Sequence, residues 1–423
     1  MNLFKKGAIG LILWGIFCLG YAHTINPVQI SQQRAAVKKI LTNLIYSYNI
    51  PGAVITYGFK GQPLQTVAVG FRDMSDFLPI ENNTLFITGS ITKSFTAMAI
   101  LDLVRSGKIQ ENETLGKIAD QYKGELKGVV SRYPSLTVVT IRELLVHTSG
   151  VPEDVNSSIF KNKFIVNPKH VWLDDELLDI AMKRPFYFKP GAAGKWSYTN
   201  TDYLLLGVVI RTIVGQEMPT VFRQLWHKAG LQNIYYANNG LIPAEALKNM
   251  ATGYISVAGS NEMQLAFKNK TKVVVPGAKH YIAYSLNNAY NVFGPTASGM
   301  IANTAALAMW YRAIFEGKLL DKMGVDMLLN GISNGKYNHA KYALGVTTHV
   351  IPTYGYVVSH DGLAPGFSLF LIYFFKYNLV VALATNSSNP YVSTFDVHNG
   401  QILPGFIGAI MPVLVGHLKR SNK

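Results

Sequence analysis

The sequence predicts an α/β fold in which an antiparallel sheet is flanked by helices and a mostly helical lobe is inserted between its strands. Strand-like patterns lie near both ends of the 423 residues, whereas most helical signals fall between about Phe86 and Tyr284. The connections between the late strands are short and rich in turn residues. They favour antiparallel neighbours, because parallel strands need long crossovers.

Two early strands are expected at Ala53–Phe59 and Gln65–Val69, joined through Lys60-Gly61-Gln62-Pro63. The late strands are expected at Tyr342–Val350, Tyr354–His360, Phe367–Phe374 and Leu379–Thr385, with turns that include the segment 362–366. With 49% hydrophobic and 15% charged residues, the chain can bury a large core. We find no internal repeat, long linker or low-complexity segment that would divide it.

A helix is predicted from Ser90 to Arg105, because Phe95, Met98 and Leu101 repeat on one side. This helix opens with the S-x-x-K motif Ser90-Ile91-Thr92-Lys93. Positions three residues apart share a helix face, so Lys93 can reach the hydroxyl of Ser90. A serine becomes a useful nucleophile only when such a base is within reach.

Two other segments match S-x-x-K, at Ser158–Lys161 and Ser333–Lys336. Ser158 follows polar loop composition, and Ser333 lies among Asn and Gly. Neither opens a long apolar helix, so a surface serine is the more probable interpretation of both. We therefore assign the nucleophile to Ser90.

A second motif, Tyr198-Thr199-Asn200, lies between a Lys-Pro-Gly loop and a helix predicted at Tyr203–Gly215. A loop held by a rigid helix is a common position for catalytic groups. Tyr236-Ala237-Asn238 has the same spacing but no comparable frame. The sequence therefore favours Tyr198 and Asn200 as site residues.

A third motif, His360-Asp361-Gly362, stands at the end of a predicted strand. His360 and Gly362 should face the same side, since side chains alternate along a strand. A lone histidine at a strand end is common and usually structural. Here the glycine two residues later favours a site, because it would permit close approach by a ligand.

Together, Ser90-x-x-Lys93, Tyr198-x-Asn200 and His360-x-Gly362 resemble the three motifs of the class C β-lactamase and penicillin-binding serine hydrolase family. The segment 140–150, which ends in His-Thr-Ser-Gly, is also similar to that family, and the likeness runs from about residue 29 to 386. The resemblance implies a β-lactamase/transpeptidase-like fold with one catalytic domain at 23–423. Its α/β lobe would comprise about 23–85 and 285–423, its helical lobe about 86–284, and its active site the cleft between them.

The resemblance also implies the chemistry. Ser90 would attack a carbonyl and form an acyl-enzyme, while Lys93 and Tyr198 transfer the protons. The backbone N–H groups of Ser90 and Leu363 would form an oxyanion hole. The expected substrate-binding residues are Asn200, His360, Gly362 and Leu363. No cofactor is expected.

The third motif departs from the Lys-Thr-Gly of many β-lactamases, because His360 and Asp361 replace its lysine and threonine. A histidine is mostly neutral at pH 7. The departure shifts the expectation toward relatives with histidine here, which include DD-peptidases and esterases. Three hypotheses stay open: a D-alanyl-D-alanine carboxypeptidase-like or β-lactamase-like hydrolase, an esterase or amidase on the same scaffold, and a non-catalytic protein that binds wall fragments. The substrate would be a β-lactam, a D-Ala-D-Ala peptide or an ester.

Residues 1–22 are typical of a secretory signal peptide, with Lys5 and Lys6 before an apolar run and small residues at its end. We therefore expect an exported protein, periplasmic or secreted. The only cysteine, Cys18, lies inside this segment. The net charge of +15 becomes +13 once the two lysines are removed. This charge could draw the protein to anionic surfaces such as cell-wall polymer or lipid headgroups, and it is explained equally well by solubility alone.

Other partners find little support in the sequence. The ten histidines show no H-E-x-x-H or similar spacing, so no metal site is expected, and no nucleic-acid motif is present. The apolar run Ile402–Val415 contains two prolines and is short for a membrane span. We expect it to form a packed terminal helix, with no span left after signal removal.

Overall fold

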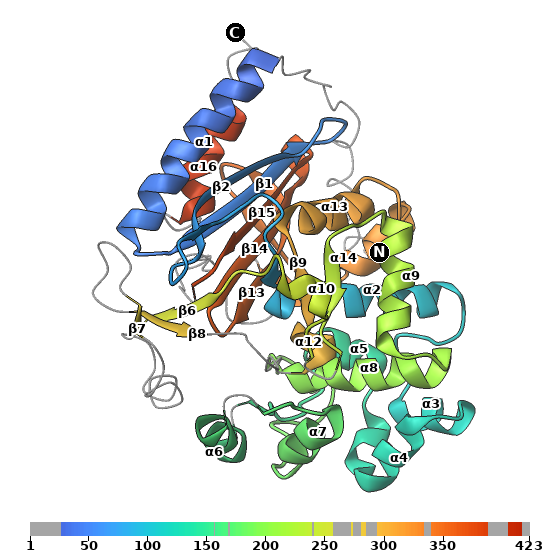
Figure 1. Cartoon of the computed structure of the whole chain (residues 1–423). Helices are drawn as coiled ribbons and strands as arrows, with labels where there is room; N and C mark the ends of the chain where they lie inside the picture. Colours follow the sequence, from blue (N-terminus) through green and yellow to red (C-terminus); the bar gives the residue numbers. More distant parts are fainter. Residues whose placement is uncertain are drawn as a thin grey trace, which may run out of the picture.

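The computed structural model describes residues 27–155, 157–167, 170–238, 241–256, 272–273, 281–284, 294–333, 340–387 and 405–416. The predicted signal segment at 1–22 lies outside these residues. An antiparallel sheet occupies the centre, with two helices on one face and the other helices on the opposite side (Figure 1). The α/β class with an antiparallel sheet is therefore confirmed.

The main sheet has nine strands in the order β10-β11-β12-β13-β14-β15-β1-β2-β3, and every neighbouring pair is antiparallel. It thus joins strands from both ends of the chain. The strands are β1 (Gly52–Phe59), β2 (Gln65–Asp73), β3 (Leu78–Pro79), β10 (Ile332–Ser333), β11 (Lys341–Tyr342), β12 (Thr347–Ile351), β13 (Gly355–Ala364), β14 (Phe367–Phe374) and β15 (Leu379–Thr385).

Two late strands differ from their predicted bounds. The predicted strand at 342–350 is split into β11 and β12, since Gly345 between them has a φ of +67°. The predicted turn at 362–366 was too long. Strand β13 continues past His360 to Ala364, which pairs with Phe367, and only Pro365 and Gly366 form the turn.

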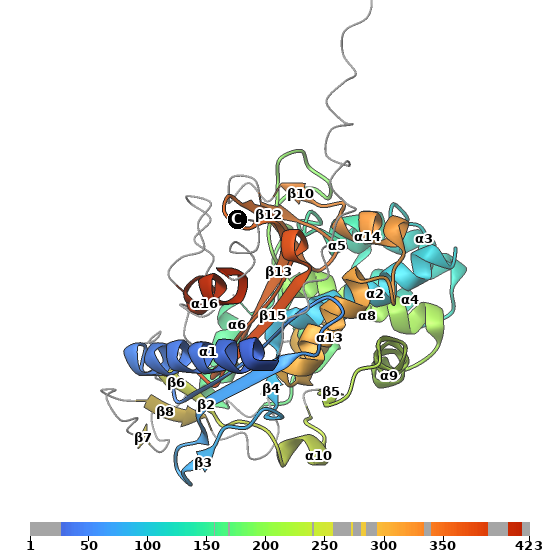
Figure 2. The ribbon, with the colours of Figure 1, turned by 90° about the horizontal axis from the view of Figure 1, so that it is seen from above.

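One face of the sheet is covered by the first and last described helices, α1 (Pro27–Ser47) and α16 (Phe406–Val415), which lie side by side (Figures 1 and 2). Their apolar residues, such as Leu41 and Leu414, form one core with alternate residues of β1, β14 and β15. The predicted C-terminal helix is thus present, beginning at Phe406 among the described residues.

A second core lies on the other face, under α13 and the helical part. Apart from α1 and α16, the described helices are η1 (Gly89–Ile91), α2 (Thr92–Arg105), α3 (Leu115–Gln121), α4 (Glu125–Arg132), η2 (Pro134–Val138), α5 (Ile141–Leu145), α6 (Ser158–Val166), α7 (Asp174–Met182), α8 (Asn200–Val214), α9 (Met218–Ala229), α10 (Ala244–Leu247), α12 (Pro295–Ser298), α13 (Thr304–Phe315), α14 (Lys322–Leu329) and the short η3 (Phe375–Tyr377) between β14 and β15.

Two small antiparallel sheets complete the described structure. The first joins β4 (Phe86–Ile87), β9 (Met300–Ala302) and β5 (Ile234–Tyr236) beside η1. The second joins β6 (Gly253–Ser256), β8 (Tyr281–Tyr284) and β7 (Lys272–Val273). Within the described ranges, no single helix has both the length and the apolar composition to cross a membrane. Helices α8 and α9 satisfy that test only as a pair bent by 86°.

Candidate active site

Ser90 lies in the short η1 helix, directly before α2. Gly89 has a φ of +54°, a conformation that favours glycine, and it turns the chain into this helix. Helix α2 is fixed deep in the molecule, because the Phe95 ring stacks on Trp310 with centroids 4.1 Å apart. Lys93, in the first turn of α2, is completely buried. The scaffold therefore holds the S-x-x-K pair on a rigid, dehydrated element.

The amine of Lys93 has three hydrogen-bonding neighbours. Its Nζ lies 3.1 Å from Ser90 Oγ, 2.6 Å from Asn200 Oδ1 and 3.2 Å from the backbone oxygen of Ala297. The predicted contact between the serine and lysine side chains is thus present. Two of the three neighbours are carbonyl oxygens, which can only accept hydrogen bonds.

Helix α12 presents the Ala297 carbonyl between α2 and α8. The hydroxyl of Thr96 donates to the backbone oxygen of Thr296 at 2.6 Å, and the Thr296 hydroxyl donates to the backbone oxygen of Tyr203 at 2.8 Å. These bonds link three helices that are far apart in sequence. They fix the direction from which the carbonyl approaches Lys93.

Burial lowers the pKa of Lys93 from 10.5 to about 7. Nearby acidic groups oppose this effect, with Glu153 first, followed by Asp154, Asp361 and Asp202. A substantial fraction of Lys93 is therefore a neutral amine at pH 7. A neutral amine beside a serine hydroxyl can accept its proton, so the site can operate as a nucleophile with its own general base.

Tyr198 reaches the site from the loop before α8. Its hydroxyl is within hydrogen-bonding reach of the Ser90 side chain, and the Lys93 amine lies 4.7 Å from the centre of its ring. Burial raises the pKa of Tyr198 well above 10. The phenol therefore keeps its proton near neutral pH and is suited to donate it rather than to act as the initial base.

The structure separates the motif residues from their look-alikes. Tyr236 lies in β5 with its ring packed against Phe222, at a centroid distance of 4.9 Å. Ser158 is exposed at the start of α6 rather than in the loop that its neighbours suggested. Ser333 ends β10, and Lys336 lies outside the described residues.

His360 is buried on β13 and makes contacts with both ring nitrogens. Nδ1 lies 2.6 Å from the backbone oxygen of Asp361, to which it can only donate, so Nε2 accepts the hydroxyl of Tyr342 at 3.2 Å. Burial lowers its pKa, and the adjacent Asp361 only partly opposes this. His360 is therefore neutral at pH 7, and this environment does not support a protonated imidazole that recognises carboxylates.

Gly362 has a different role from the one inferred from the sequence. A Cβ atom at this position would lie 1.9 Å from the backbone oxygen of Thr88, so the close approach is made by the protein's own backbone. A Cβ atom on Gly89 would likewise lie 2.7 Å from the backbone nitrogen of Leu363. The two glycines bring the Leu363 amide next to the Ser90 turn, where the oxyanion hole is expected.

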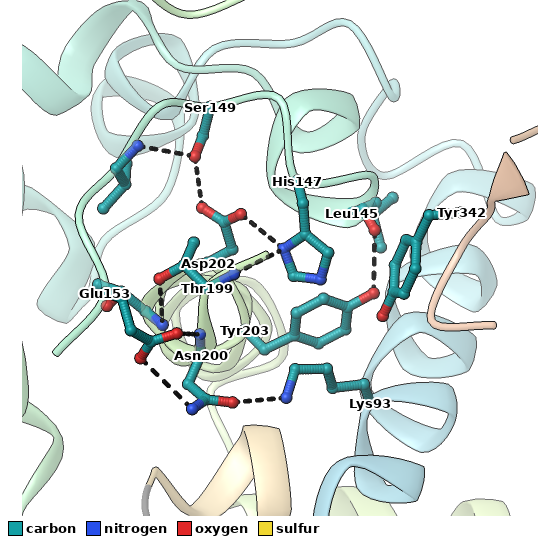
Figure 3. Close-up of polar contacts among 12 residues, drawn as sticks. Lys93, Leu145, His147, Ser149, Glu153, Thr199, Asn200, Asp202, Tyr203 and Tyr342 are labelled. Atoms are coloured by element: carbon teal, nitrogen blue, oxygen red, sulfur yellow. Dashed lines mark hydrogen bonds and ion pairs between the residues drawn. The ribbon is translucent and has the colours of Figure 1, made fainter. Parts of the chain in front are cut away.

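Several site residues lie outside the three motifs (Figure 3). The Nδ1 atom of His147 lies 2.9 Å from Asp202 Oδ2, and the hydroxyl of Ser149 donates to Asp202 Oδ1 at 2.5 Å. Burial lowers the pKa of His147 and raises that of Asp202, so neither charge is favoured. The His147 ring packs 4.4 Å from that of Tyr198, centroid to centroid. This network supports the ring of Tyr198, so the role of His147 is structural.

Glu153 is the other site residue that the motifs did not reveal. It follows the His-Thr-Ser-Gly segment, is 4% exposed, and accepts hydrogen bonds from the backbone and side chain of Asn200 (Figure 3). Its only signal in the sequence is the acidic pair Glu153-Asp154, which lies in the polar stretch before Ser158. Among the described residues, no group of three or more His, Cys, Asp or Glu could hold a metal ion.

Comparisons with known proteins found a matching family and similar sequences and structures. The profile of the family described as Beta-lactamase matches residues 34–398. "Protein flp" from Staphylococcus aureus (strain NCTC 8325 / PS 47) is 24% identical over 379 residues, which cover 88% of this chain and 67% of that protein. "Penicillin-binding protein 4*" from Bacillus subtilis (strain 168) is 24% identical over 332 residues, which cover 77% of this chain and 66% of that protein.

Among solved structures, a D-stereospecific amidohydrolase from Streptomyces sp. superposes with a TM-score of 0.67 at 22% identity. The match covers 84% of this chain and 94% of that one. This likeness supports the β-lactamase/transpeptidase-like fold. The chain spans about two thirds of the length of the two curated relatives above.

Proposed function

Because the chain belongs to the β-lactamase family, a family of serine hydrolases, we propose that it hydrolyses an amide or ester through an acyl intermediate on Ser90. The observation that carries this proposal is the pairing of Ser90 Oγ with the buried, readily deprotonated amine of Lys93, 3.1 Å away. A non-catalytic wall-fragment binder would need neither this pair nor the adjacent tyrosine.

In the proposed first step, the Ser90 oxygen attacks the substrate carbonyl while its proton moves to Lys93 Nζ. The backbone N–H groups of Ser90 and Leu363 would stabilise the resulting oxyanion. The leaving group then takes a proton from the hydroxyl of Tyr198, which the lysine ammonium replenishes. A water molecule, deprotonated by Lys93 and Tyr198, then attacks the acyl carbonyl and releases the acyl group from Ser90. No step calls for a cofactor.

The charge around the site favours the amidase or esterase hypothesis over a carboxypeptidase or β-lactamase. In the described part of the chain, no arginine and no lysine other than Lys93 makes a hydrogen bond or ion pair with Ser90, Tyr198, Asn200 or His360. His360 is neutral, and the carboxylate of Asp361 beside it is about half exposed, at 51%. A substrate carboxylate here would meet negative charge, whereas an amide would not.

The nucleophile can be tested by Ser90→Ala, which removes only the attacking oxygen. We expect the mature wild type to form a covalent adduct with a fluorescent penicillin or an activated acyl ester, and the variant to form none. Ser158→Ala is the matched control and should label like the wild type. Labelling of Ser90→Ala at the wild-type rate would refute the proposal.

The substrate class can be tested with a matched pair of compounds, N-acetyl-D-alanyl-D-alanine and the corresponding D-alaninamide. An amidase should show the higher kcat/KM with the uncharged amide, and Asp361→Asn should reduce the difference. A preference for the free carboxylate that Asp361→Asn leaves unchanged would restore the carboxypeptidase hypothesis.

We also propose that the protein is exported, on the strength of the signal-like segment at 1–22, and that its net charge favours contact with anionic wall polymer. N-terminal sequencing of the protein from a cell envelope fraction tests the first point. Salt-dependent co-sedimentation with isolated cell wall tests the second. An unprocessed cytoplasmic protein, or binding that salt does not weaken, would contradict these proposals.

A further inference from the structure

Glu153 is a buried acid outside all three motifs, and burying a carboxylate is costly unless its oxygens are satisfied. Its Oε2 accepts the backbone N–H of Asn200 at 2.8 Å. Its Oε1 accepts the Asn200 side-chain amide at 3.4 Å and the backbone N–H of Val155 at 3.4 Å. Two of its three contacts thus go to one residue of the Tyr-x-Asn motif.

The carboxylate also lies at the N-terminus of α8, since Asn200 is the first residue of that 15-residue helix. A negative charge at this position is favourable, because the first N–H groups of a helix lack partners within it. The neighbouring Asp154 has its pKa raised well above the usual value by burial and by the nearby Glu153 carboxyl. Of the acidic groups near Lys93, the Glu153 carboxylate acts most strongly to raise the pKa of the lysine.

These contacts decide which way the Asn200 amide points. The NH₂ end faces Glu153, which leaves the oxygen facing Lys93 Nζ at 2.6 Å. A flipped amide would place its oxygen against the carboxylate and its NH₂ group against the lysine. Either contact would be unfavourable, so the carboxylate excludes the flip.

The amide orientation in turn fixes the lysine. A neutral amine has two N–H bonds and one lone pair. Asn200 Oδ1 and the Ala297 oxygen only accept, so each takes one N–H. The lone pair is then left for the third neighbour, Ser90 Oγ, at 3.1 Å. Ser90 must therefore donate its hydroxyl proton to Lys93, which is the direction that nucleophilic attack requires.

We infer that Glu153 is a positioning residue that holds the Asn200 amide oxygen toward Lys93 and thereby aims the lone pair of the lysine at Ser90. The inference rests on the proposed acyl-serine mechanism. Once the proton has moved to Lys93, the ammonium gains a third N–H bond and faces the negative charge of Glu153. The same carboxylate thus also stabilises the charged product of that step, and its removal should lower the pKa of Lys93.

The test measures kcat/KM against pH for the mature protein with a neutral N-acetyl-D-alanine ester, which has no titrating group. For Glu153→Gln we expect a loss of about 10- to 100-fold, with the acid limb of the profile moved to lower pH. Glu153→Asp keeps the charge but withdraws it from Asn200, so it should lose activity with little movement of the limb. In the Asn200→Ala background, Glu153→Gln should cost clearly less than in the wild type, since the orienting contact is already lost and only the direct effect of the charge on Lys93 remains.

Glu113→Gln is the matched control. Glu113 is also a buried glutamate, 7% exposed, whose carboxylate accepts a backbone N–H, from Gln110 at 3.0 Å. It is not among the charges that act on Lys93. We expect this variant to keep the wild-type profile, which separates a general loss of packing from an effect on the lysine.

The inference is overturned if Glu153→Gln reacts within twofold of the wild type, if its limb does not move, or if its loss multiplies independently with that of Asn200→Ala. Should Glu153→Gln not fold, Glu153→Asp decides, because wild-type activity in that variant would equally overturn the inference. A wild type that no acyl donor labels would instead refute the proposed function itself.

Discussion

At the scale of single residues, the buried amine of Lys93 controls the chemistry. Its burial removes the hydration that would stabilise the charged form. The acidic groups around it offset part of this loss. The result is a pKa of about 7, where small changes in environment alter the fraction of active base. Burial likewise favours the neutral forms of Tyr198, whose pKa it raises, and of His360, whose pKa it lowers.

These shifts predict the pH dependence. The reactive form of Lys93 is the neutral amine, so kcat/KM for a neutral ester should rise as the pH passes upward through about 7 and then level off. Because the pKa of His360 is lowered, His360→Gln should leave this limb in place, even if it reduces the rate. A pH–rate series on both proteins is the measurement. A limb that disappears in His360→Gln would assign the titration to the histidine.

At the scale of elements, the site depends on the contact between η1 and β13. Gly89 and Gly362 let the two backbones meet without side chains between them. Beyond Ser359, β13 no longer pairs with β12 and keeps only β14 as its neighbour, so this end of the strand lies at the sheet edge beside the active-site turn. The alternation that buries His360 and Gly362 leaves Asp361 and Leu363 exposed.

Gly362→Ala tests this contact. The added Cβ would meet the backbone oxygen of Thr88 at 1.9 Å, so β13 must move away from η1. We expect the unfolding free energy to fall by about 1–3 kcal/mol and acylation to slow at least tenfold, because the Leu363 amide moves with the strand.

Gly128→Ala is the control for that substitution. Gly128 lies in α4, and a Cβ there would have no atom within 4 Å. Its activity should be unchanged and its stability equal to the wild type or greater by up to about 1 kcal/mol. Denaturant unfolding and probe labelling of both variants provide the comparison. Normal labelling by Gly362→Ala would show that the close approach does not matter for the site.

At the scale of the whole molecule, the two ends of the described chain close one face of the sheet. Helices α1 and α16 pack on each other and on the strands, whereas the active site lies with the second core on the opposite face. The side-chain amide of Gln33 in α1 donates to the backbone oxygen of Leu414 in α16 at 3.3 Å. The core under α1 and α16 therefore contributes stability from the face away from the active site.

Leu414→Ala should separate stability from catalysis. The side chain is fully buried, and truncation of a buried leucine costs about 2–5 kcal/mol. We expect a lower midpoint in denaturant unfolding, with acyl labelling of the native protein unchanged. Val28→Ala, at a residue of α1 that is 65% exposed, should stay within about 0.5 kcal/mol of the wild type. A loss of labelling in folded Leu414→Ala would contradict the independence of the two faces.

Sequence patterns alone were enough to predict the class of the fold, strands β14 and β15 to the residue, and the local pairing of Ser90 with Lys93. These depend on alternation, on turn residues and on a spacing of three along one helix, all of which act over short stretches of chain. The Lys-Pro-Gly loop and the predicted helix on either side of Tyr198 also selected it over Tyr236. The roles of these residues in catalysis stay predictions until the variants are measured.

The surroundings of the lysine, in contrast, come from segments that only folding brings together. The partners Asn200 and Ala297 are 107 and 204 residues away from Lys93, and Glu153 acts through Asn200. The lowered pKa values of Lys93 and His360 and the role of Gly362 follow from burial and from backbone contacts between distant segments. No local pattern encodes such distances, because packing brings these groups together only when the two cores form.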